Sequence, residues 1–476
     1  MPENQLRSRR LTHSAFASPS KALLPEEPVI GRVPCVIVIE AVEYSLKKGG
    51  RTMEQVVVDR QGEESVVSGH LWIFSNQVKG RPAGFPDGGL VEIRGERGRF
   101  LGIGTYNSKS LIAVRVLSRE RAAIDEAFFA RRIADALKRR AGRYGGSFRV
   151  VNSESDFLPG LVIDKYEGQM ALQLLTCGME RLKGSIVDAV KKSFSPSAIV
   201  LRNDSVSRKE EGLPQYVEVA DGAIVSPSVI TVGPLRFLVD ILAGHKTGSY
   251  FDQSENRPLM REFCPGRTVL DLFSYTGGFG LHALYFGARS VTFVDTSGQA
   301  LDMCRENAEL NGLSGGKFVR SDGFDFLKNS IEEHDVIVLD PPSFIKSRKK
   351  IKEGERGYID LHKRALRRLS DDGLLFTFSC SYHMKRSRFR DVVRIASYGM
   401  ADVFLVRELS QAGDHPILLT IPETDYLKGL ILRVRRRGAK RGREGRTRVA
   451  MEEDRKVRSA KDSLYTGPCE ICAENS

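Results

Sequence analysis

The chain has 476 residues, with 73 Lys and Arg against 60 Asp and Glu and a formal net charge of +13. Hydrophobic residues make up 41% of it, a composition typical of globular proteins, which excludes a mostly disordered or collagen-like chain. The length predicts several domains of roughly 100–200 residues each, and the basic charge makes nucleic acid or an acidic membrane surface a partner to test.

The cysteines and apolar runs indicate the compartment. Seven cysteines are spread irregularly along the chain, which does not match a disulfide framework and favours a reducing, cytoplasmic location. No apolar run approaches the roughly 20 residues that cross a bilayer. We interpret residues 1–52 as a poorly ordered extension or a start-site artefact, since Met53 stands just before the first strand-like run. Their Arg- and Ser-rich start also faintly resembles an organellar transit peptide.

Short apolar runs cut by Gly and Pro begin at Val56, among them HLWIFS, GLVEIRG and LIAVRVL. Their spacing predicts a small all-β unit that ends near Ser118. Residues 121–144 then predict a helix, because apolar residues recur at helical intervals with Arg and Lys between them. Further strand-like runs and a helix over about 180–193 indicate an α+β region that extends to about residue 230.

Beyond residue 230, buried-strand runs alternate regularly with helical segments: TVLDLF, SVTFVD, DVIVLD and GLLFTFS. Continuous apolar runs of this length are typical of parallel strands covered on both faces. The region therefore predicts a doubly wound α/β domain, with its ligand at the carboxyl ends of the strands. After Val434 the sequence becomes RRRGAKRGREGRTR, a charge run that we expect to be disordered.

Three successive strand ends carry an aspartate. Asp271 ends the first strand before a Gly-rich turn, Asp295 ends the second strand 24 residues later, and Asp322 follows the third. An acid in the second position can hold both ribose hydroxyls of a nucleoside, and Asp322 can reach an exocyclic amine. The pattern predicts a pocket for a nucleoside with a cationic tail, which fits S-adenosylmethionine. The alternative is that each Asp only caps a helix.

The fourth and fifth strands end in residues suited to covalent chemistry. Asp340 precedes two prolines, which fix an extended turn, and Cys380 follows the run GLLFTFS. A thiolate that adds to C6 of cytosine makes C5 nucleophilic enough to accept a methyl group, and a carboxyl group near N3 stabilises that addition. Cys380 and Asp340 supply these two parts, although a strand Cys is more often a small core residue. His383 and His415 are weaker candidates as proton carriers.

Residues 53–436 resemble the bacterial PUA-domain-containing, S-adenosylmethionine-dependent methyltransferases of large-subunit ribosomal RNA, specifically the cytosine-C5 group. The resemblance rests on ordered segments that include SGHLWIFSNQV, DFLPGLVIDKY, GHKTGSYFDQSENR, DLFSYTGGFG, VDTS, DPPSF, FTFSCS, GDHP and PETDYLKGL.

The resemblance implies a class I methyltransferase architecture: a Rossmann-like domain preceded by a small PUA β-barrel and a central α+β domain. The implied segments are an extension (1–52), a PUA-like RNA-binding domain (53–120), a linking helix and central domain (121–230), the methyltransferase domain (231–436) and a basic tail (437–476). No metal is implied. The implied nucleophile is Cys380, and the implied substrate-binding acid is Asp340. The implied cofactor-binding residues are Gln253, Asp271, Phe273, Ser274, Tyr275, Thr276, Gly277, Asp295 and Asp322.

Some features depart from the wider pattern or have two interpretations. Phe273 and Tyr275 stand where most methyltransferases have glycine, and Ser343 stands where many RNA cytosine-C5 methyltransferases have a second Cys that assists release. The base that removes the C5 proton is therefore unassigned. The basic stretch 346–368 is either an RNA-phosphate contact or a solvated helix face. The terminal pair Cys469 and Cys472 lacks the further ligands of a zinc site.

The sequence therefore predicts an enzyme that transfers methyl from S-adenosylmethionine to C5 of a cytidine in large-subunit rRNA. One alternative is methylation of another base or atom, such as an exocyclic amine of guanine, which needs no thiol. Another is a noncatalytic RNA-binding factor of ribosome assembly. A nicotinamide dehydrogenase is disfavoured, because the GxGxxG pattern of dinucleotide sites is missing.

Overall fold

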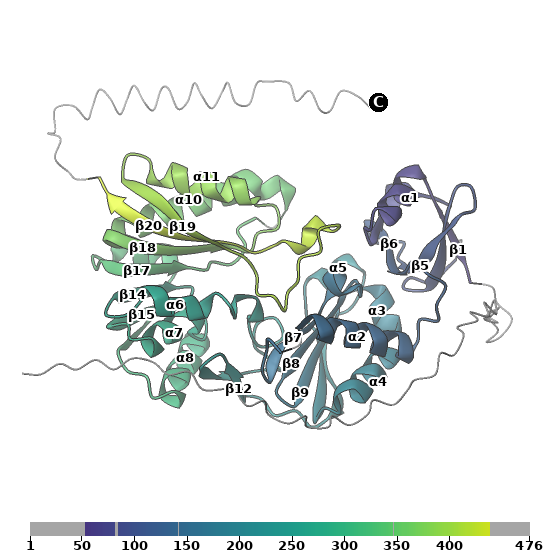
Figure 1. The fold of residues 1–476 in the computed structure, drawn as a ribbon, viewed down its shortest axis with the longest axis horizontal. Helices are drawn as coiled ribbons and strands as arrows, with labels where there is room; N and C mark the ends of the chain where they lie inside the picture. Colours follow the sequence, from purple (N-terminus) through teal and green to yellow (C-terminus); the bar gives the residue numbers. More distant parts are fainter. Residues whose placement is uncertain (1–52, 81–83, 141, 346, 438–476) are drawn as a thin grey trace, which may run out of the picture. The chain divides into compact units, whose positions relative to one another are not determined.

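The computed structural model describes residues 53–80, 84–140, 142–345 and 347–437 (Figure 1). The predicted extension over residues 1–52, nearly all of the predicted basic tail and the Cys469–Cys472 pair lie outside the described residues. Within the described ranges, no helix is long and apolar enough to cross a membrane.

The first part of the described chain is a six-stranded sheet in the order β2-β6-β5-β4-β1-β3. The strands are β1 (Gln55–Val58), β2 (Trp72–Phe74), β3 (Val78–Gly80), β4 (Leu90–Gly95), β5 (Phe100–Tyr106) and β6 (Ile112–Ser118). Its core includes Val56, Ile73 and Val114, which are fully buried. The sequence prediction missed helix α1 (Arg60–Val67), which begins where the Asp59 carboxylate accepts a hydrogen bond from the Gly62 amide.

The central part is a five-stranded mixed sheet in the order β11-β10-β9-β8-β7, with two long helices. Its strands are β7 (Ser147–Asn152), β8 (Leu161–Tyr166), β9 (Gln169–Leu174), β10 (Ala198–Asn203) and β11 (Tyr216–Gly222). Its helices are α2 (Glu126–Arg140), α3 (Cys177–Arg181), α4 (Lys183–Phe194) and α5 (Ser207–Glu210), with a 3-10 turn η2 (Ser153–Asp156). The helix predicted over residues 121–144 is observed as α2, which buries Phe128, Phe129 and Ile133. The helix predicted over about 180–193 is observed as α4.

A hairpin of β12 (Ser228–Val232) and β13 (Leu235–Val239) leads into a seven-stranded sheet in the order β16-β15-β14-β17-β18-β20-β19. The strands are β14 (Thr268–Leu272), β15 (Ser290–Asp295), β16 (Gly316–Arg320), β17 (His334–Leu339), β18 (Leu369–Ser379), β19 (Ala401–Leu409) and β20 (Lys428–Arg436). The pairs among β14 to β18 are parallel, and β20 runs antiparallel to both of its neighbours. This is the predicted mostly parallel, Rossmann-like sheet.

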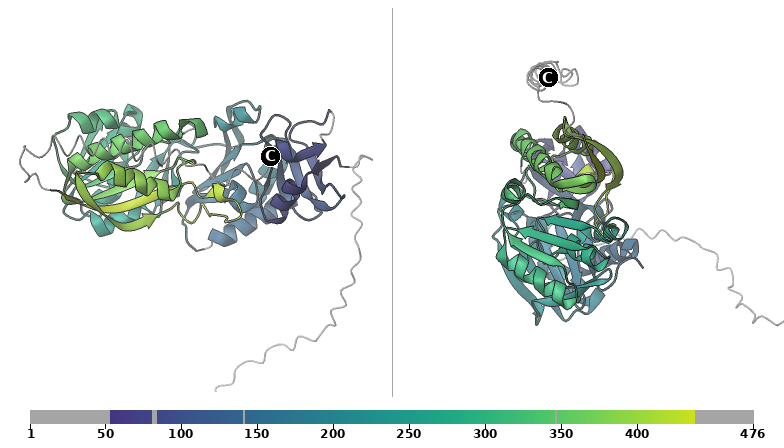
Figure 2. Two further views of the ribbon diagram at one scale, coloured as in Figure 1. Left: turned by 90° about the horizontal axis from the view of Figure 1, so that it is seen from above. Right: turned by 90° about the vertical axis from the view of Figure 1, so that its left-hand side faces the viewer.

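Helices cover both faces of the large sheet (Figure 1, with two further views in Figure 2). They are α6 (Met260–Phe263), α7 (Gly278–Tyr285), α8 (Gly298–Leu310), α9 (Gly323–Asn329), α10 (Ile351–Arg368) and α11 (Arg386–Ser397). Successive residues of β14 enter different cores: Val269 packs in the cluster that contains residues of α7 and α8, and Leu270 in the one that contains residues of α10 and α11. Two-sided burial explains the continuous apolar runs in the sequence.

The expectation of disorder directly after Val434 is wrong for the next residues. Arg435 and Arg436 belong to β20, and Arg436 forms an ion pair with Glu333 at 2.6 Å. Arg437 follows the strand and pairs with Asp402 at 2.7 Å. The charge run therefore begins inside the sheet, where carboxylates compensate its first cations.

Candidate functional site

A cavity of about 630 Å³ lies at the carboxyl ends of β14, β15, β17 and β18. This is where an open parallel sheet binds its ligand, because the strand order reverses direction next to β14. All predicted site residues except Gly277 line the cavity: Gln253, Asp271, Phe273, Ser274, Tyr275, Thr276, Asp295, Asp322, Asp340 and Cys380. The structure thus brings together residues that are up to 127 positions apart, from Gln253 to Cys380.

The turn after β14 has an unusual backbone. Phe273 and Tyr275 adopt φ values of 66° and 49°, a left-handed conformation that is costly for bulky side chains and is concentrated at functional sites. Hydrogen bonds hold the turn: the Phe273 amide donates to the Val294 carbonyl at 2.9 Å, and the Tyr275 amide donates to Asp295 Oδ2 at 2.9 Å. Gly277 contributes shape, since its φ is 90° and a Cβ would lie 2.4 Å from the Cys304 sulfur.

The three strand-end aspartates differ in their environments. Asp271 is 2% exposed and accepts a hydrogen bond from the Gly280 amide at 2.8 Å; burial, with a smaller contribution from the charge of Asp340, raises its pKa to about 7. Asp295 accepts from the Ser297 amide at 2.9 Å as well as from Tyr275. Asp322 caps α9 through the Phe324 amide at 2.8 Å. Asp322 therefore does cap a helix, but it also lines the cavity, so capping is not its only place in the structure.

Asp340 and Cys380 follow directly after β17 and β18. Burial and the charge of Asp252 raise the pKa of Asp340 to about 6, while Gln253 Nε2 donates a hydrogen bond to its Oδ2 at 3.0 Å. Burial and the nearby Asp340 charge raise the pKa of Cys380 to about 11. The thiol is therefore neutral near pH 7 and needs a proton acceptor before it can act as a nucleophile.

Residues not predicted from the sequence complete the cavity wall. The Lys246 ammonium lies 2.8 Å from Asp252 Oδ2 and 4.3 Å from the centroid of the Tyr250 ring. The Tyr426 hydroxyl donates to the same Asp252 oxygen at 2.8 Å. Burial opposes ionisation of Asp252, but the charges of Lys246 and His415 and the hydrogen bonds hold its pKa well below the usual range.

These residues belong to the segments GHKTGSYFDQSENR and PETDYLKGL, which carry part of the family resemblance. The available signal was their concentration of charged and aromatic side chains. No strand-end position pointed to them, because the first segment precedes β14.

Three residues that line the cavity each have a buried polar atom without a hydrogen-bond partner among the described residues: Asp252 Oδ1, Arg257 Nε and Ser274 Oγ. Buried polar groups are normally satisfied, so such atoms indicate a polar ligand. The acidic wall suits a cation, and these unpaired donors and acceptors suit an amino acid group. The residues present therefore fit S-adenosylmethionine, which combines a sulfonium, an amino acid end and a nucleoside.

The two candidate histidines do not line the cavity. His415 is buried, and its Nδ1 lies 2.7 Å from Asp414 Oδ1. His383 packs edge-on against Tyr382. Ser343 does line the cavity, and its Oγ lies 3.0 Å from Ser381 Oγ, one residue after Cys380.

The described part of the basic stretch 346–368 forms a 3-10 turn, η5 (Arg348–Lys350), and helix α10. One face of α10 buries Tyr358 and Leu361 in the core. Some of its cations have carboxylate neighbours, such as Arg364 with Asp360 at 3.0 Å. Contact with RNA phosphates stays a prediction for this segment.

Comparisons with known proteins agree with the geometry. Residues 56–119 match a model of a PUA-like domain, and residues 216–377 match a model of S-adenosylmethionine-dependent methyltransferases. The chain is 40% identical to "Ribosomal RNA large subunit methyltransferase I" of Klebsiella pneumoniae over 396 residues, which cover 80% of this chain and 98% of the relative. It is 41% identical to the protein of the same name from Aeromonas salmonicida over 390 residues, which cover 78% and 97%.

Solved structures support the fold. The structure of the methyltransferase SMU.776 in complex with SAH has a TM-score of 0.71 at 20% identity and covers 80% of this chain and 100% of that chain. A protein from Streptococcus mutans described as a SAM-dependent methyltransferase has a TM-score of 0.69, with the same identity and coverage. The identity to these sequence relatives and the two domain matches confirm the resemblance predicted from the motifs. The chain belongs to the family of PUA-domain-containing, S-adenosylmethionine-dependent methyltransferases that includes the ribosomal RNA large subunit methyltransferase I proteins.

Proposed function

We propose that this protein transfers a methyl group from S-adenosylmethionine to C5 of a cytidine in large-subunit ribosomal RNA through a covalent bond between Cys380 and C6. The observation that carries the proposal is the presence of Cys380 and Asp340 in one cavity with the strand-end acids Asp271, Asp295 and Asp322. The names of the relatives support large-subunit rRNA as the substrate. Such a substrate implies that the protein acts in the cytoplasm.

The turn after β14 and the strand-end acids would hold the cofactor in this proposal. Bound S-adenosylmethionine supplies an electrophilic methyl group. Asp295 would accept hydrogen bonds from the ribose hydroxyls, and Asp322 would accept one from the exocyclic amine of the adenine. The turn from Phe273 to Thr276 brings the chain close to the nucleoside. Asp271, beside the N-terminus of α7, faces the cationic end.

Asp340 and Cys380 act together on the cytosine. The Asp340 carboxylate takes the thiol proton, the Cys380 sulfur bonds to C6, and the same proton passes from Asp340 to N3 as the ring becomes an enamine. The pKa of about 6 for Asp340 suits both steps, because the group can accept and release a proton near neutral pH. After C5 has gained the methyl group, its proton leaves to a base and the bond between C6 and sulfur breaks. The proton on N3 returns through Asp340 to the departing sulfur, which restores both the thiol and the carboxylate. With Ser343 in place of the second Cys, that base is not a thiol at this position.

The nature of the methylated nucleoside tests this function. The purified protein is incubated with large-subunit rRNA and S-adenosylmethionine that carries an isotope-labelled methyl group, and the nucleosides are analysed by mass spectrometry. We expect labelled 5-methylcytidine. A labelled N-methylguanosine would instead support chemistry at an exocyclic amine. RNA binding without methyl transfer and without S-adenosylmethionine binding in calorimetry would support a noncatalytic assembly factor. Comparing rRNA from cells with and without the gene would then locate the nucleotide.

A further inference from the structure

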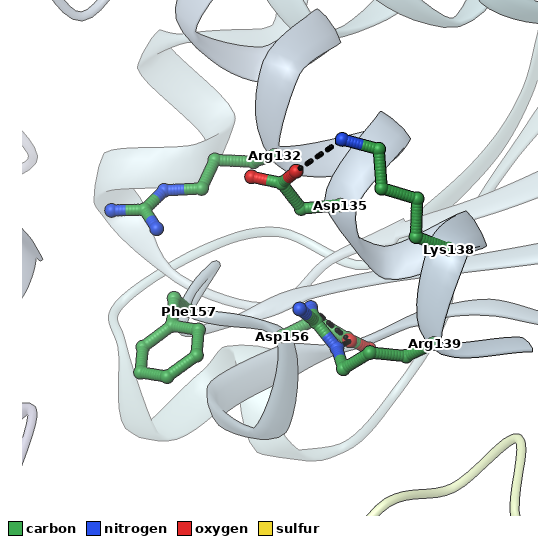
Figure 3. Close-up of a pocket in the computed structure, with 6 residues that line it drawn as sticks. All are labelled: Arg132, Asp135, Lys138, Arg139, Asp156 and Phe157. Atoms are coloured by element: carbon green, nitrogen blue, oxygen red, sulfur yellow. Dashed lines mark hydrogen bonds and ion pairs between the residues drawn. The ribbon is translucent and has the colours of Figure 1, made fainter.

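A second cavity, of about 350 Å³, lies between α2 and η2 in the central part of the chain. Its lining is basic and aromatic: Arg132, Asp135, Lys138, Arg139, Asp156 and Phe157 (Figure 3). None of these residues lines the cavity that contains Cys380.

Two arginines share one carboxylate in this second cavity. Asp156 is fully buried, and its Oδ1 accepts hydrogen bonds from Arg139 Nη2 at 2.8 Å and from Arg140 Nη1 at 3.0 Å. Arg140 Nη2 also donates to Asp156 Oδ2 at 2.7 Å. One positive charge is therefore left without compensation. Asp135 does not supply the missing charge, because its Oδ1 pairs with Lys138 at 3.3 Å.

Arg132 adds a further positive charge to the same cavity. Its guanidinium lies 5.3 Å from the Phe128 ring centroid and 5.6 Å from that of Phe157. Its Nη2 donates to the Leu117 carbonyl at 3.2 Å, and no carboxylate lies within ion-pair distance among the described residues. Burial, together with the charges of Arg139, Arg119 and Arg131, lowers the pKa of Arg132 although Asp135 opposes this. An anion in the cavity would relieve this repulsion.

Phe157 is held there in a strained conformation. It adopts a φ of 59° at the end of η2, which is rare for a bulky residue and typical of functional positions. In Figure 3 its ring lies beneath the Arg132 guanidinium. The two aromatic neighbours pre-orient Arg132, so little side-chain entropy is lost when it contacts an anion.

The second cavity is connected to the site of the proposed chemistry through hydrogen bonds. Arg140, which binds Asp156, also donates to the Asp414 carbonyl through Nη2 at 2.7 Å. Two residues earlier, the Ala412 amide donates to the Asp252 carbonyl at 2.8 Å, and Asp252 lines the Cys380 cavity. A residue that holds Asp156 in the second cavity is therefore two hydrogen-bonded steps away from a residue of the Cys380 cavity.

We propose that the cavity between α2 and η2 binds the phosphate backbone of the RNA substrate, with Arg132 and Arg139 as the phosphate contacts and Phe157 against the sugar. The partner class rests on the proposed function. Such contacts position the substrate and carry no sequence information.

The test compares Arg132→Gln with Lys191→Gln. Lys191 is an exposed cation of α4 that pairs with Asp221 at 2.7 Å, so both variants lose one charge from the same central part of the chain. Affinity for the large-subunit rRNA transcript is measured at several KCl concentrations, together with kcat and KM for methyl transfer. We expect Arg132→Gln to weaken binding about 5-fold at low salt, to reduce the slope of log K against log salt by about 1, and to raise KM without changing kcat. Lys191→Gln should change binding less than about 2-fold.

Further variants and probes separate the explanations. Arg132→Lys, which keeps the charge, should restore most of the affinity and the slope; failure to do so would point to lost packing and contradict the proposal. Inorganic phosphate that protects the wild type but not Arg132→Gln in thermal unfolding, with equal RNA affinity for both, would make this a free-anion site and overturn the proposal.

The outcomes for this cavity and for the proposed function are distinguishable. Equal rRNA affinity of Arg132→Gln and Lys191→Gln in a protein that methylates rRNA overturns the cavity proposal alone. Arg132-dependent rRNA binding without methyl transfer retains it and overturns the function. A wild-type protein that does not bind rRNA contradicts both.

Discussion

Asp340 illustrates, at the scale of a single residue, how a functional group can cost stability. Its pKa is raised to about 6, mainly by burial, whereas an unperturbed Asp titrates near 3.9. Below about pH 4 both the folded and the unfolded chain hold this proton, so ionisation of the carboxyl then costs the folded state no stability. Above that pH the unfolded chain ionises more readily, and stability is lost progressively until the pH passes about 6.

Asp340→Asn should therefore stabilise the protein at pH 8, because it removes a carboxylate that the folded state holds unfavourably. We expect a gain of about 1–2 kcal/mol; partial exposure of the carboxyl to the cavity keeps the gain this small. It should also abolish methyl transfer. The gain in thermal stability should vanish as the pH approaches 4. Thermal unfolding between pH 4 and 8 measures this.

Asp335→Asn is the matched control for this measurement. Burial alone would raise the pKa of Asp335. Hydrogen bonds from the Thr268 amide and hydroxyl, both at 2.9 Å, outweigh burial and hold that pKa below its usual value. Its contribution to stability is therefore present at neutral pH and lost on acidification, so the Asn variant should be less stable at pH 8. A loss of stability at pH 8 in Asp340→Asn as well would contradict the raised pKa of Asp340.

At the scale of elements, the turn between β14 and α7 depends on Gly277. A Cβ added at this position would meet the Cys304 sulfur. The substituted residue would also have to adopt the φ of 90° that Gly277 has. We expect Gly277→Ala to lower the free energy of unfolding by about 3 kcal/mol and to weaken S-adenosylmethionine binding, because the turn must shift. Denaturant unfolding and calorimetry measure the two effects.

Gly266→Ala serves as the control for this prediction. Gly266 has a φ of 71°, but its Cβ would meet no atom within 4 Å. This variant should lose only about 1 kcal/mol, from backbone strain, and should keep its cofactor affinity. If the two variants behave alike, close packing against Cys304 does not shape the turn.

The strands and strand-end residues could be predicted because local pattern and topology agree in the large sheet. Asp295, Asp340 and Cys380 stand at the ends of apolar runs, Asp271 is the penultimate residue of β14, and the ends of parallel strands converge on one edge. Lys246 could not be predicted in this way. Its partner is Asp252 in a short 3-10 helix, η3 (Phe251–Gln253), and Asp252 is held in turn by Tyr426 from a distant part of the chain. Such long-range polar contacts leave no periodic signal.

Strand β20 was missed at its end for a different reason. Val434 is fully buried, but its neighbours Arg433 and Arg435 are exposed and lie near Asp372 at 2.9 Å and Asp402 at 3.6 Å. The alternation of a strand is present, yet the surrounding arginines make the segment look like a charged tail. The carboxylates that compensate them lie on other elements and cannot be recognised from the local sequence.

At the scale of the whole molecule, a short basic run follows β20, whereas the last residues, 451–476, contain 4 basic and 6 acidic residues. Residues 438–450 contain 5 basic residues and 1 acidic residue. Removing residues 438–476, which leaves β20 and its ion pairs intact, should weaken rRNA binding and its salt dependence without abolishing methyl transfer, because these cations can only add sequence-independent affinity. A salt titration of rRNA binding checks this. Unchanged affinity and slope would exclude a role for the segment in binding.

Covalent trapping tests the central claim most directly. Large-subunit rRNA that contains 5-azacytidine is offered with S-adenosylmethionine; nitrogen at position 5 leaves no proton to eliminate, so the bond between C6 and sulfur should persist. We expect a denaturant-resistant adduct that peptide mass spectrometry maps to Cys380. Cys380→Ala should form no adduct yet bind S-adenosylmethionine normally. Cys177→Ala is the matched control, because Cys177 is a buried free cysteine that does not line the cavity. This variant should still form the adduct. Methyl transfer to C5 by Cys380→Ala, or an adduct at another residue, would contradict the account.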